Sequence, residues 1–220
     1  MNIAIIPDGN GRWAKNRLKP RSFGHKAGAK KIEEITESCI KLGVKSLSVY
    51  AFSTENWRRP KKEVDFLMQL LSEYLESKIA LYLENNIIFK AIGDLSIFKQ
   101  DLRDKIKELE SKTIKNCNGL TQILALNYGA KDELRRAFNK IAKDSSDIKE
   151  SDIQSALDFK SDIDILIRTG GEKRLSNFLL WQAAYAELFF SDTLWPDFST
   201  NELESIILEF KKRERRFGGL

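Results

Sequence analysis

Short apolar runs, evenly spread along the chain, most strongly constrain its fold. Six of them are predicted to be strands: Ile3–Ile6, Leu47–Phe52, Ile87–Ile92, Gln122–Leu126, Ile163–Ile167 and Leu188–Phe190. The first, second, fourth and fifth are rich in β-branched residues or leucine and lack polar alternation, which is typical of strands covered on both faces. These four runs therefore indicate the buried centre of a sheet.

Amphipathic segments separate most of these runs and predict helices. Their bounds are Gly24–Leu42, Glu63–Leu83, Ile97–Lys115, Lys131–Lys143 and Glu202–Arg216. Alternating strands and helices indicate an α/β fold, with a central, mainly parallel six-stranded sheet flanked by helices. We expect residues 1–220 to form a single domain.

Polar clusters follow the first, second, fourth and fifth predicted strands. They are Asp8, Ser53-Thr54-Glu55-Asn56-Trp57, Asn127-Tyr128-Gly129 and Arg168-Thr169-Gly170-Gly171. Ligands of parallel sheets bind beyond the carboxyl ends of the strands. The clusters are therefore expected to meet at one ligand-binding edge.

The segment Pro7–Arg12 joins the first strand to a helical pattern through a turn with two glycines. Such a turn lets backbone N–H groups converge on an anion, and Asp8 at the strand end can hold a Mg²⁺ that bridges phosphate oxygens. A simple tight turn is the alternative, because Gly and Asn tolerate positive φ. A pure turn does not require Arg12 and Trp13 to follow, so the pattern favours a diphosphate site.

Composition narrows the chemistry. His25 is the only histidine, and Cys39 and Cys117 are far apart, which argues against a zinc site and for reduced, buried cysteines. The net charge of +5 is concentrated in two basic runs, 58–62 and 211–216, which fit a solvated surface, a phosphorylated ligand, an anionic membrane or RNA. Without a long apolar run or a leader segment, the chain is expected to be cytoplasmic.

The predicted helix Glu63–Leu83 is apolar around a broad arc. Core packing explains such an arc in most proteins. The alternative is that part of it lines an apolar channel between the sheet and the helices, beside the expected phosphate site.

Four blocks of sequence carry a family resemblance. They are Asp8-Gly9-Asn10-Gly11-Arg12-Trp13-Ala14, Gly24-His25-Lys26-Ala27-Gly28, Phe52-Ser53-Thr54-Glu55-Asn56-Trp57-Arg58-Arg59-Pro60, and the segment from Asp164 to Gln182 around Arg168-Thr169-Gly170-Gly171-Glu172. In this order they resemble the signature blocks of the cis-prenyltransferases, from residue 2 to the end of the chain. Pro7 departs from the family, which usually has methionine there.

The resemblance implies head-to-tail condensation of isopentenyl diphosphate onto an allylic primer, usually farnesyl diphosphate, with cis double bonds and Mg²⁺. An undecaprenyl diphosphate product, a lipid carrier precursor for cell-wall polysaccharide, is the family default, and another product length is the alternative. Charge neutralisation of the leaving diphosphate needs no covalent nucleophile.

The resemblance also assigns residues. Asp8 and Glu187 would bind the metal, and Asp8, His25, Ser53 and Asn56 are the candidate catalytic residues, with the proton acceptor left open among His25, Ser53, Asn56 and the diphosphate itself. The substrate-binding residues would be Gly9, Asn10, Gly11, Arg12, Trp13, Arg21, His25, Phe52, Ser53, Asn56, Trp57, Arg59, Arg168, Arg174 and Ser176. Of these, Arg12 and Arg21 would hold the allylic diphosphate, and Arg168, Arg174 and Ser176 the isopentenyl diphosphate.

The family further implies a homodimer in which Arg216-Phe217-Gly218 reaches the partner's site, and delivery of the product to the membrane, with peripheral association at the inner face. Nucleic acid is not an expected partner. A trans-type prenyl synthase is all-helical and disagrees with the predicted strands, and a non-catalytic partner subunit would lack the Asp8 and Arg168 blocks. A salt-dependent RNA-binding assay would test the remaining alternative, an RNA-binding module.

Overall fold

A six-stranded sheet in which every strand pairs in parallel forms the centre of the computed structural model, which describes residues 1–142 and 147–215. The strands are β1 (Asn2–Ile6), β2 (Ser46–Ser53), β3 (Ile88–Ile92), β4 (Thr121–Tyr128), β5 (Ile165–Arg168) and β6 (Glu187–Phe190). Their order across the sheet is β3-β4-β2-β1-β5-β6. The α/β prediction and all six predicted strands are confirmed, with ends shifted by a few residues.

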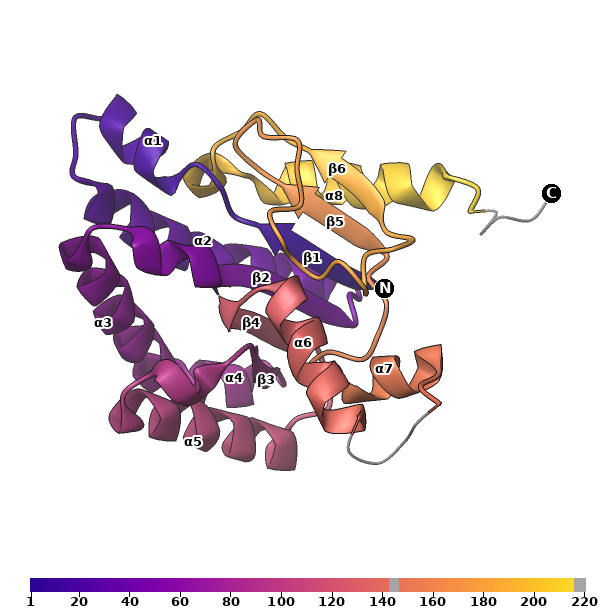
Figure 1. Cartoon of the computed structure of the whole chain (residues 1–220). Helices are drawn as coiled ribbons and strands as arrows, with labels where there is room; N and C mark the ends of the chain where they lie inside the picture. Colours follow the sequence, from indigo (N-terminus) through magenta and orange to yellow (C-terminus); the bar gives the residue numbers. More distant parts are fainter. Residues whose placement is uncertain (143–146, 216–220) are drawn as a thin grey trace.

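Helices surround the sheet (Figure 1). They are α1 (Asn10–Asn16), α2 (Arg21–Lys41), α3 (Lys61–Ser77), α4 (Ile79–Glu84), α5 (Gln100–Asn116), α6 (Ala130–Ile141), α7 (Glu150–Ala156) and α8 (Thr200–Lys212), with 3-10 turns at η1 (Thr54–Arg58), η2 (Leu95–Ile97) and η3 (Trp195–Asp197). The single helix expected over Glu63–Leu83 is two helices that meet at Lys78, whose ammonium lies 2.9 Å from Glu33 of α2. The helical pattern expected from Arg12 is α1, which begins two residues earlier, whereas the short helix α7 was not predicted, because it has only seven residues and too few apolar positions to show a period.

Alternate residues of the central strands enter two separate hydrophobic cores, as expected for a sheet buried on both faces. Ile3 and Ile5 of β1 belong to one core, to which α2, α3, α5 and α8 contribute. Ala4 and Ile6 belong to the other, which the start of α6 and the segment 175–186 cover.

The register of the sheet brings the carboxyl ends of the strands to one edge. Ile6 pairs with Arg168, Arg168 pairs with Phe190, and Ser53 pairs with Tyr128. The residues that follow β1, β2, β4 and β5 therefore lie at the same end of the molecule, as predicted from the sequence.

The outer edge of β3 is covered by side chains of α5. The backbone N–H of Phe89 donates to Thr113 Oγ1 at 3.0 Å, and that of Ala91 donates to Glu110 Oε1 at 2.8 Å. These bonds satisfy edge groups that no neighbouring strand reaches.

In the part of the chain that the structure describes, no helix combines the length and apolar character needed to cross a bilayer.

Candidate active site

The turn after β1 is held in place from two other segments. The N–H of Asp8 donates to Thr169 Oγ1 at 2.9 Å, and its carbonyl accepts from the N–H of Trp195 at 2.9 Å. Gly9 follows with φ +108°, and a Cβ there would lie 2.7 Å from the Leu194 side chain. Both the left-handed backbone and the close approach require glycine. The turn is thus fixed, and the Asp8 carboxylate projects from it.

Two glycines of α2 let the start of α1 pack directly on its backbone. A Cβ at Gly24 would lie 2.0 Å from the carbonyl oxygen of Asn10, and one at Gly28 would lie 2.4 Å from Asn10 Oδ1. The Gly24–Gly28 block of the sequence is therefore explained by close packing: it positions the first turn of α1, whose N–H groups have no partner within the helix.

Arginine side chains flank the Asp8 carboxylate. Arg168 Nη2 donates to Asp8 Oδ2 at 2.9 Å, and Arg12 Nη2 lies 3.3 Å from Asp8 Oδ1. The Arg168 guanidinium is buried, and its Nη1 donates at 2.6 Å to Ser176 Oγ and to the carbonyl of Arg174. Its Nε is buried without a hydrogen-bond partner among the described residues. Arg168 therefore joins the Asp8 turn to the segment after β5.

A second ionic cluster lies around Glu63, at the start of α3. Its carboxylate accepts from Arg21 Nε at 3.0 Å and from Arg59 Nη1 at 3.2 Å, and lies 3.0 Å from His25 Nε2. The Arg21 guanidinium passes over Gly11, where a Cβ would lie 2.4 Å from it. Glu63 thus links α3 to α2 and to the residue after η1, and it fixes the side chains of Arg21, His25 and Arg59.

Burial and charge set the protonation of this cluster. Burial lowers the pKa of His25 below its ordinary value of 6.5, in spite of the hydrogen bond to Glu63. Burial would raise the pKa of Glu63, but its bonds to Arg21 and His25 outweigh burial and lower it. At neutral pH the site therefore contains a neutral imidazole and an ionised Glu63.

Three adjoining hollows open around this framework, and Pro7 lines all of them. The turn hollow, of about 190 Å³, is lined by Pro7, Asp8, Gly9, Asn10, Gly11, Arg12, Arg21, His25, Tyr50, Ala51, Asn56, Arg59 and Leu67. The loop hollow, of about 500 Å³, is lined by Ile6, Pro7, Asp8, Tyr50, Ser53, Glu55, Asn56, Arg59, Arg168, Ser176 and Asn177. Two adjoining arginine-lined spaces thus share Asp8, and with it Pro7, Tyr50, Asn56 and Arg59.

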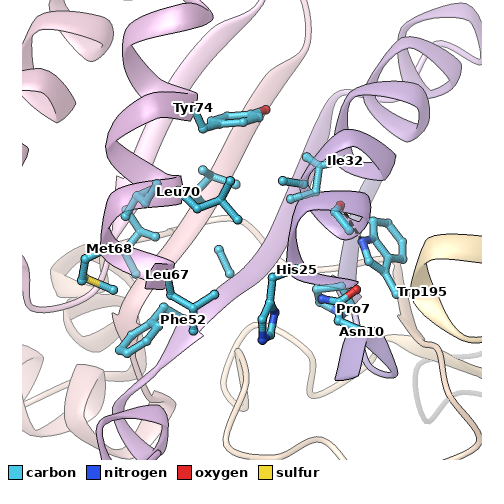
Figure 2. Close-up of a pocket in the computed structure, with 16 residues that line it drawn as sticks. Pro7, Asn10, His25, Ile32, Phe52, Leu67, Met68, Leu70, Tyr74 and Trp195 are labelled. Carbon is cyan, nitrogen blue, oxygen red and sulfur yellow. Dashed lines mark hydrogen bonds between the residues drawn. The ribbon is translucent and has the colours of Figure 1, made fainter. Parts of the chain in front are cut away.

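The third hollow, the apolar pocket, lies between α2, α3 and the sheet (Figure 2). It has a volume of about 100 Å³ and is lined by Pro7, Asn10, His25, Gly28, Ala29, Ile32, Ala51, Phe52, Leu67, Met68, Leu70, Leu71, Tyr74, Leu124, Leu126 and Trp195. It shares Pro7, Asn10, His25, Ala51 and Leu67 with the turn hollow. A space lined by arginines therefore continues directly into a hydrophobic one.

Most of the predicted site residues line these hollows, and four do not. Trp13 packs on Phe23 and donates to Asp197 Oδ1 at 2.7 Å. Trp57 donates to Asn127 Oδ1 at 2.8 Å and packs against Phe52, so it supports a residue that lines the apolar pocket without lining the pocket itself.

Arg174 is mostly exposed and pairs with Glu172. The fourth, Glu187, is placed apart from Asp8 within this chain. Glu187 begins β6 and its carboxylate pairs with Arg213 at 2.5 Å. In the sheet register Glu187 pairs with Ile165, which pairs with Ile3 at the start of β1. Asp8 is five residues beyond Ile3, which corresponds to roughly 16 Å along the strand direction. Within this chain Asp8 and Glu187 therefore lie too far apart to share a metal ion, and the metal site that joins them stays a prediction.

The residues that line the turn and loop hollows but are absent from the sequence-based assignment are Ile6, Pro7, Tyr50, Ala51, Glu55, Leu67 and Asn177. Tyr50 lies within a buried strand and donates to the Tyr128 carbonyl at 3.0 Å, so its sequence context gives no sign of a site. Pro7 could have been predicted as a lining residue, because it directly precedes Asp8 in the sequence. The segment Arg216-Phe217-Gly218 lies outside the described residues.

The donor set fits Mg²⁺ only as a partly substrate-held ion. Among residues 1–142 and 147–215, no three His, Cys, Asp or Glu side chains gather closely enough to hold a metal. Mg²⁺ commonly takes one or two carboxylates and completes its shell with water and substrate phosphates. Asp8, which lines both arginine-lined hollows, would provide that single carboxylate.

Comparisons with known proteins agree with this geometry. A family model for undecaprenyl diphosphate synthases matches residues 6–218. The isoprenyl transferase of Wolinella succinogenes is 57% identical over 221 residues, covering 100% of this chain and 96% of the relative. That of Helicobacter pylori is 52% identical over 227 residues, covering 100% and 97%.

Two solved structures have the same fold. A probable undecaprenyl diphosphate synthase from Campylobacter jejuni has a TM-score of 0.86 at 38% identity, covering 99% of this chain and 98% of its own. A lavandulyl diphosphate synthase from Lavandula x intermedia, in complex with dimethylallyl diphosphate, has a TM-score of 0.93 at 36% identity, covering 99% and 97%.

Proposed function

Because this chain belongs to the undecaprenyl diphosphate synthase family and is a cis-prenyltransferase, we propose that it condenses isopentenyl diphosphate onto farnesyl diphosphate to give undecaprenyl diphosphate. The observation that carries the proposal is the pair of arginine-lined hollows that meet at Asp8, one of which continues into the apolar pocket. A condensation of two diphosphates requires two anion sites, and one substrate requires room for a hydrocarbon tail.

The turn hollow is the proposed site of the allylic diphosphate. Arg12, Arg21 and Arg59 line it, and guanidinium groups suit phosphate oxygens because their donors match the oxygens in pairs. The first turn of α1 adds backbone donors at the same place. These groups neutralise the charge that develops on the leaving diphosphate.

The loop hollow is the proposed site of isopentenyl diphosphate. Arg168 and Ser176 line it, and Arg174 follows on the same exposed segment, from which its side chain can turn toward the hollow. The two diphosphates would thus lie on either side of Asp8. Mg²⁺, when bound, supplies charge neutralisation of the diphosphates, and Asp8 is the residue that would hold it.

The proton released on condensation must leave beside the isopentenyl group. Ser53 and Asn56 line the loop hollow, and the Asn56 side chain accepts from the Ser53 N–H at 3.2 Å. His25 lies on the other side, in the turn hollow. Burial lowers its pKa in spite of the bond to Glu63, so the imidazole is neutral at neutral pH and can accept a proton. All three side chains, together with the diphosphate, remain candidate acceptors.

Incubation of the protein with farnesyl diphosphate, labelled isopentenyl diphosphate and Mg²⁺, followed by sizing of the products, tests the proposal. Undecaprenyl diphosphate is the expected product, and omission of Mg²⁺ or addition of a chelator should abolish its formation. A product of another length would support a cis-prenyltransferase of different specificity. Absence of any condensation by the folded protein would contradict the proposed reaction.

We further propose that the enzyme is a homodimer that delivers its product to the membrane. Leu188 and Phe190, on the edge strand β6, are 40% and 37% exposed, which suits contact with a second copy. Sedimentation of the wild-type protein and of Leu188→Asp should give a dimer and a weakened dimer, respectively. A wild-type monomer at micromolar concentration would contradict this assignment.

A further inference from the structure

Asn177 joins three parts of the molecule beside the loop hollow, which it lines. Its backbone carbonyl accepts from the N–H of Ala130 at 2.8 Å, and its Oδ1 accepts from the N–H of Lys131 at 3.0 Å. Its Nδ2 donates to Glu55 Oε1 at 3.1 Å. The segment after β5 is therefore fastened both to the start of α6 and to η1.

The start of α6 is shaped to receive Asn177. The first N–H groups of a helix have no partner within it, and Gly129, which precedes α6, has no side chain with which to cap them. A Cβ at Gly129 would lie 2.6 Å from Asn177 Nδ2 and 2.9 Å from Thr54 Oγ1. The absence of a side chain at Gly129 thus admits the Asn177 amide, which takes the place of the missing cap.

The backbone around Asn177 depends on these anchors. Ser176 and Asn177 have φ of +49° and +63°, in the left-handed region that residues with a side chain rarely adopt. Such residues persist only where their surroundings hold them. The next residue, Phe178, is buried and stacks on Tyr50 with ring centres 4.4 Å apart. Asn177 and Phe178 therefore hold in place a conformation that the segment alone would not keep.

This conformation decides where Ser176 and Arg168 lie. Arg168 Nη1 donates at 2.6 Å to Ser176 Oγ and to the carbonyl of Arg174, and both Arg168 and Ser176 line the loop hollow. The Arg168 guanidinium is buried, so its position depends on the acceptors of this segment as well as on Asp8. A shift of the segment would move two of the groups that are proposed to bind isopentenyl diphosphate.

We propose that Asn177 is a positioning residue for isopentenyl diphosphate: by bridging α6 and Glu55, it holds Ser176 and Arg168 where the diphosphate binds. The inference rests on the proposed function. In that reaction the diphosphate of isopentenyl diphosphate is retained in the product, so contacts to it are similar in the ground state and in the transition state. Loss of the Asn177 contacts should therefore raise KM for isopentenyl diphosphate more than it lowers kcat.

Asn177→Gly is the principal test, because glycine adopts the left-handed backbone readily and only the amide is lost. We expect KM for isopentenyl diphosphate to rise about tenfold or more, since a misplacement of about 1 Å can cost about a hundredfold. The KM for the primer, which is assigned to the turn hollow, and kcat should each change less than about threefold. Steady-state assays with each substrate varied in turn give these constants, and thermal melting checks that the variant folds.

Asn177→Asp tests the bond to Glu55 separately. Burial would raise the pKa of Glu55, but its hydrogen bonds, including that from Asn177, outweigh burial and lower it. Aspartate keeps an acceptor for the N–H of Lys131 but places a second carboxylate opposite Glu55, so KM for isopentenyl diphosphate should rise. In a Glu55→Gln background, where the glutamine NH₂ can donate to the aspartate, the same change should raise this KM less than about threefold. This pair of backgrounds carries the test if Asn177→Gly does not fold.

Asn86→Gly is the matched control. Asn86 also has a left-handed backbone, with φ +55°, and its side chain accepts from the N–H of Asn118 and donates to Asn118 Oδ1, each at 2.8 Å. It lies between α4 and β3 and lines none of the three hollows. The change should lower Tm but leave KM for isopentenyl diphosphate unchanged.

Three results would overturn the inference. They are a KM for isopentenyl diphosphate within about twofold of wild type in folded Asn177→Gly, an equal rise in KM for both substrates, and an equal effect of Asn177→Asp in both backgrounds. Absence of condensation in the wild-type protein would overturn the proposed function instead.

Discussion

Replacing Asp8 by asparagine should separate its role in stability from its role in catalysis. Asparagine keeps an acceptor oxygen for Arg168 but removes the charge that compensates this buried guanidinium. Breaking a buried ion pair costs about 3–5 kcal/mol. Because the Asp8 side chain is 30% exposed and its second partner, Arg12, is 49% exposed, we expect a smaller loss, about 1–2 kcal/mol. For a chain of this size, that corresponds to a fall in Tm of about 2–8 °C.

The effect on turnover should be much larger. Asp8 is the carboxylate shared by both diphosphate hollows, and its loss removes the protein's ligand to Mg²⁺ where charge develops in the reaction. Removal of one such electrostatic group typically lowers the rate about 10²–10³-fold. A thousandfold loss is equivalent to about 4 kcal/mol of transition-state stabilisation, clearly more than the loss of folding free energy.

Asp132→Asn is the matched control. Asp132 is 28% exposed and also pairs with two arginines, Arg135 at 2.7 Å and Arg136 at 2.9 Å, but lies on α6 away from the hollows. Thermal melting and single-turnover condensation assays should show a comparable fall in Tm for both variants and a loss of activity only for Asp8→Asn. Turnover by folded Asp8→Asn within about tenfold of wild type, a barrier change of only about 1.4 kcal/mol, would refute the assigned role.

Three further results are expected. Tyr82→Phe should lower the free energy of unfolding by about 1–3 kcal/mol in urea titrations, because it leaves the buried Gln122 Oε1 without its donor, and an unchanged midpoint would contradict this bond. Arg174→Ala should raise KM for isopentenyl diphosphate more than KM for the primer, and equal changes would argue against two separate diphosphate sites. The folded-state pKa of His25 is below 6.5, so the unfolded state binds the proton more tightly than the folded state does. The free energy of unfolding should therefore fall as pH drops from 7 through 6.5, and His25→Asn should reduce this dependence on pH. An equal dependence in the variant would show that another group is responsible.

The fold could be predicted from sequence because its strands are buried on both faces. Ile3–Ile6 and Ile163–Ile167 are continuous apolar runs with no competing helical period, and both are strands, the second beginning two residues later than expected. The break at Lys78 could not be predicted, because Ile79, Leu81 and Tyr82 continue the apolar pattern across it. At the break, Lys78 pairs with Glu33 of α2 at 2.9 Å, a tertiary contact that leaves no local signal in the sequence.

Site residues could be predicted where a charged residue follows a buried strand, because packing of the fold does not require a charge there. Asp8 and Arg168 at strand ends were identified for that reason, and the structure brings them into contact. Trp13 was placed in the site by its neighbours in the sequence, but the rotation of α1 turns it toward Asp197. A linear motif does not specify which face of a short helix each side chain takes, so such residues need the three-dimensional structure.

The bonds from Thr113 and Glu110 to the edge of β3 have a consequence for how copies of this sheet can join. Because these side chains occupy the N–H groups of Phe89 and Ala91, a foreign strand finds no free donors on that side. The other border of the sheet is β6. With the β3 border blocked, strand-to-strand association is left to the β6 border alone, and two copies joined there would present only their blocked borders outward, so association through the sheet would end in a closed pair and would not propagate into a fibre.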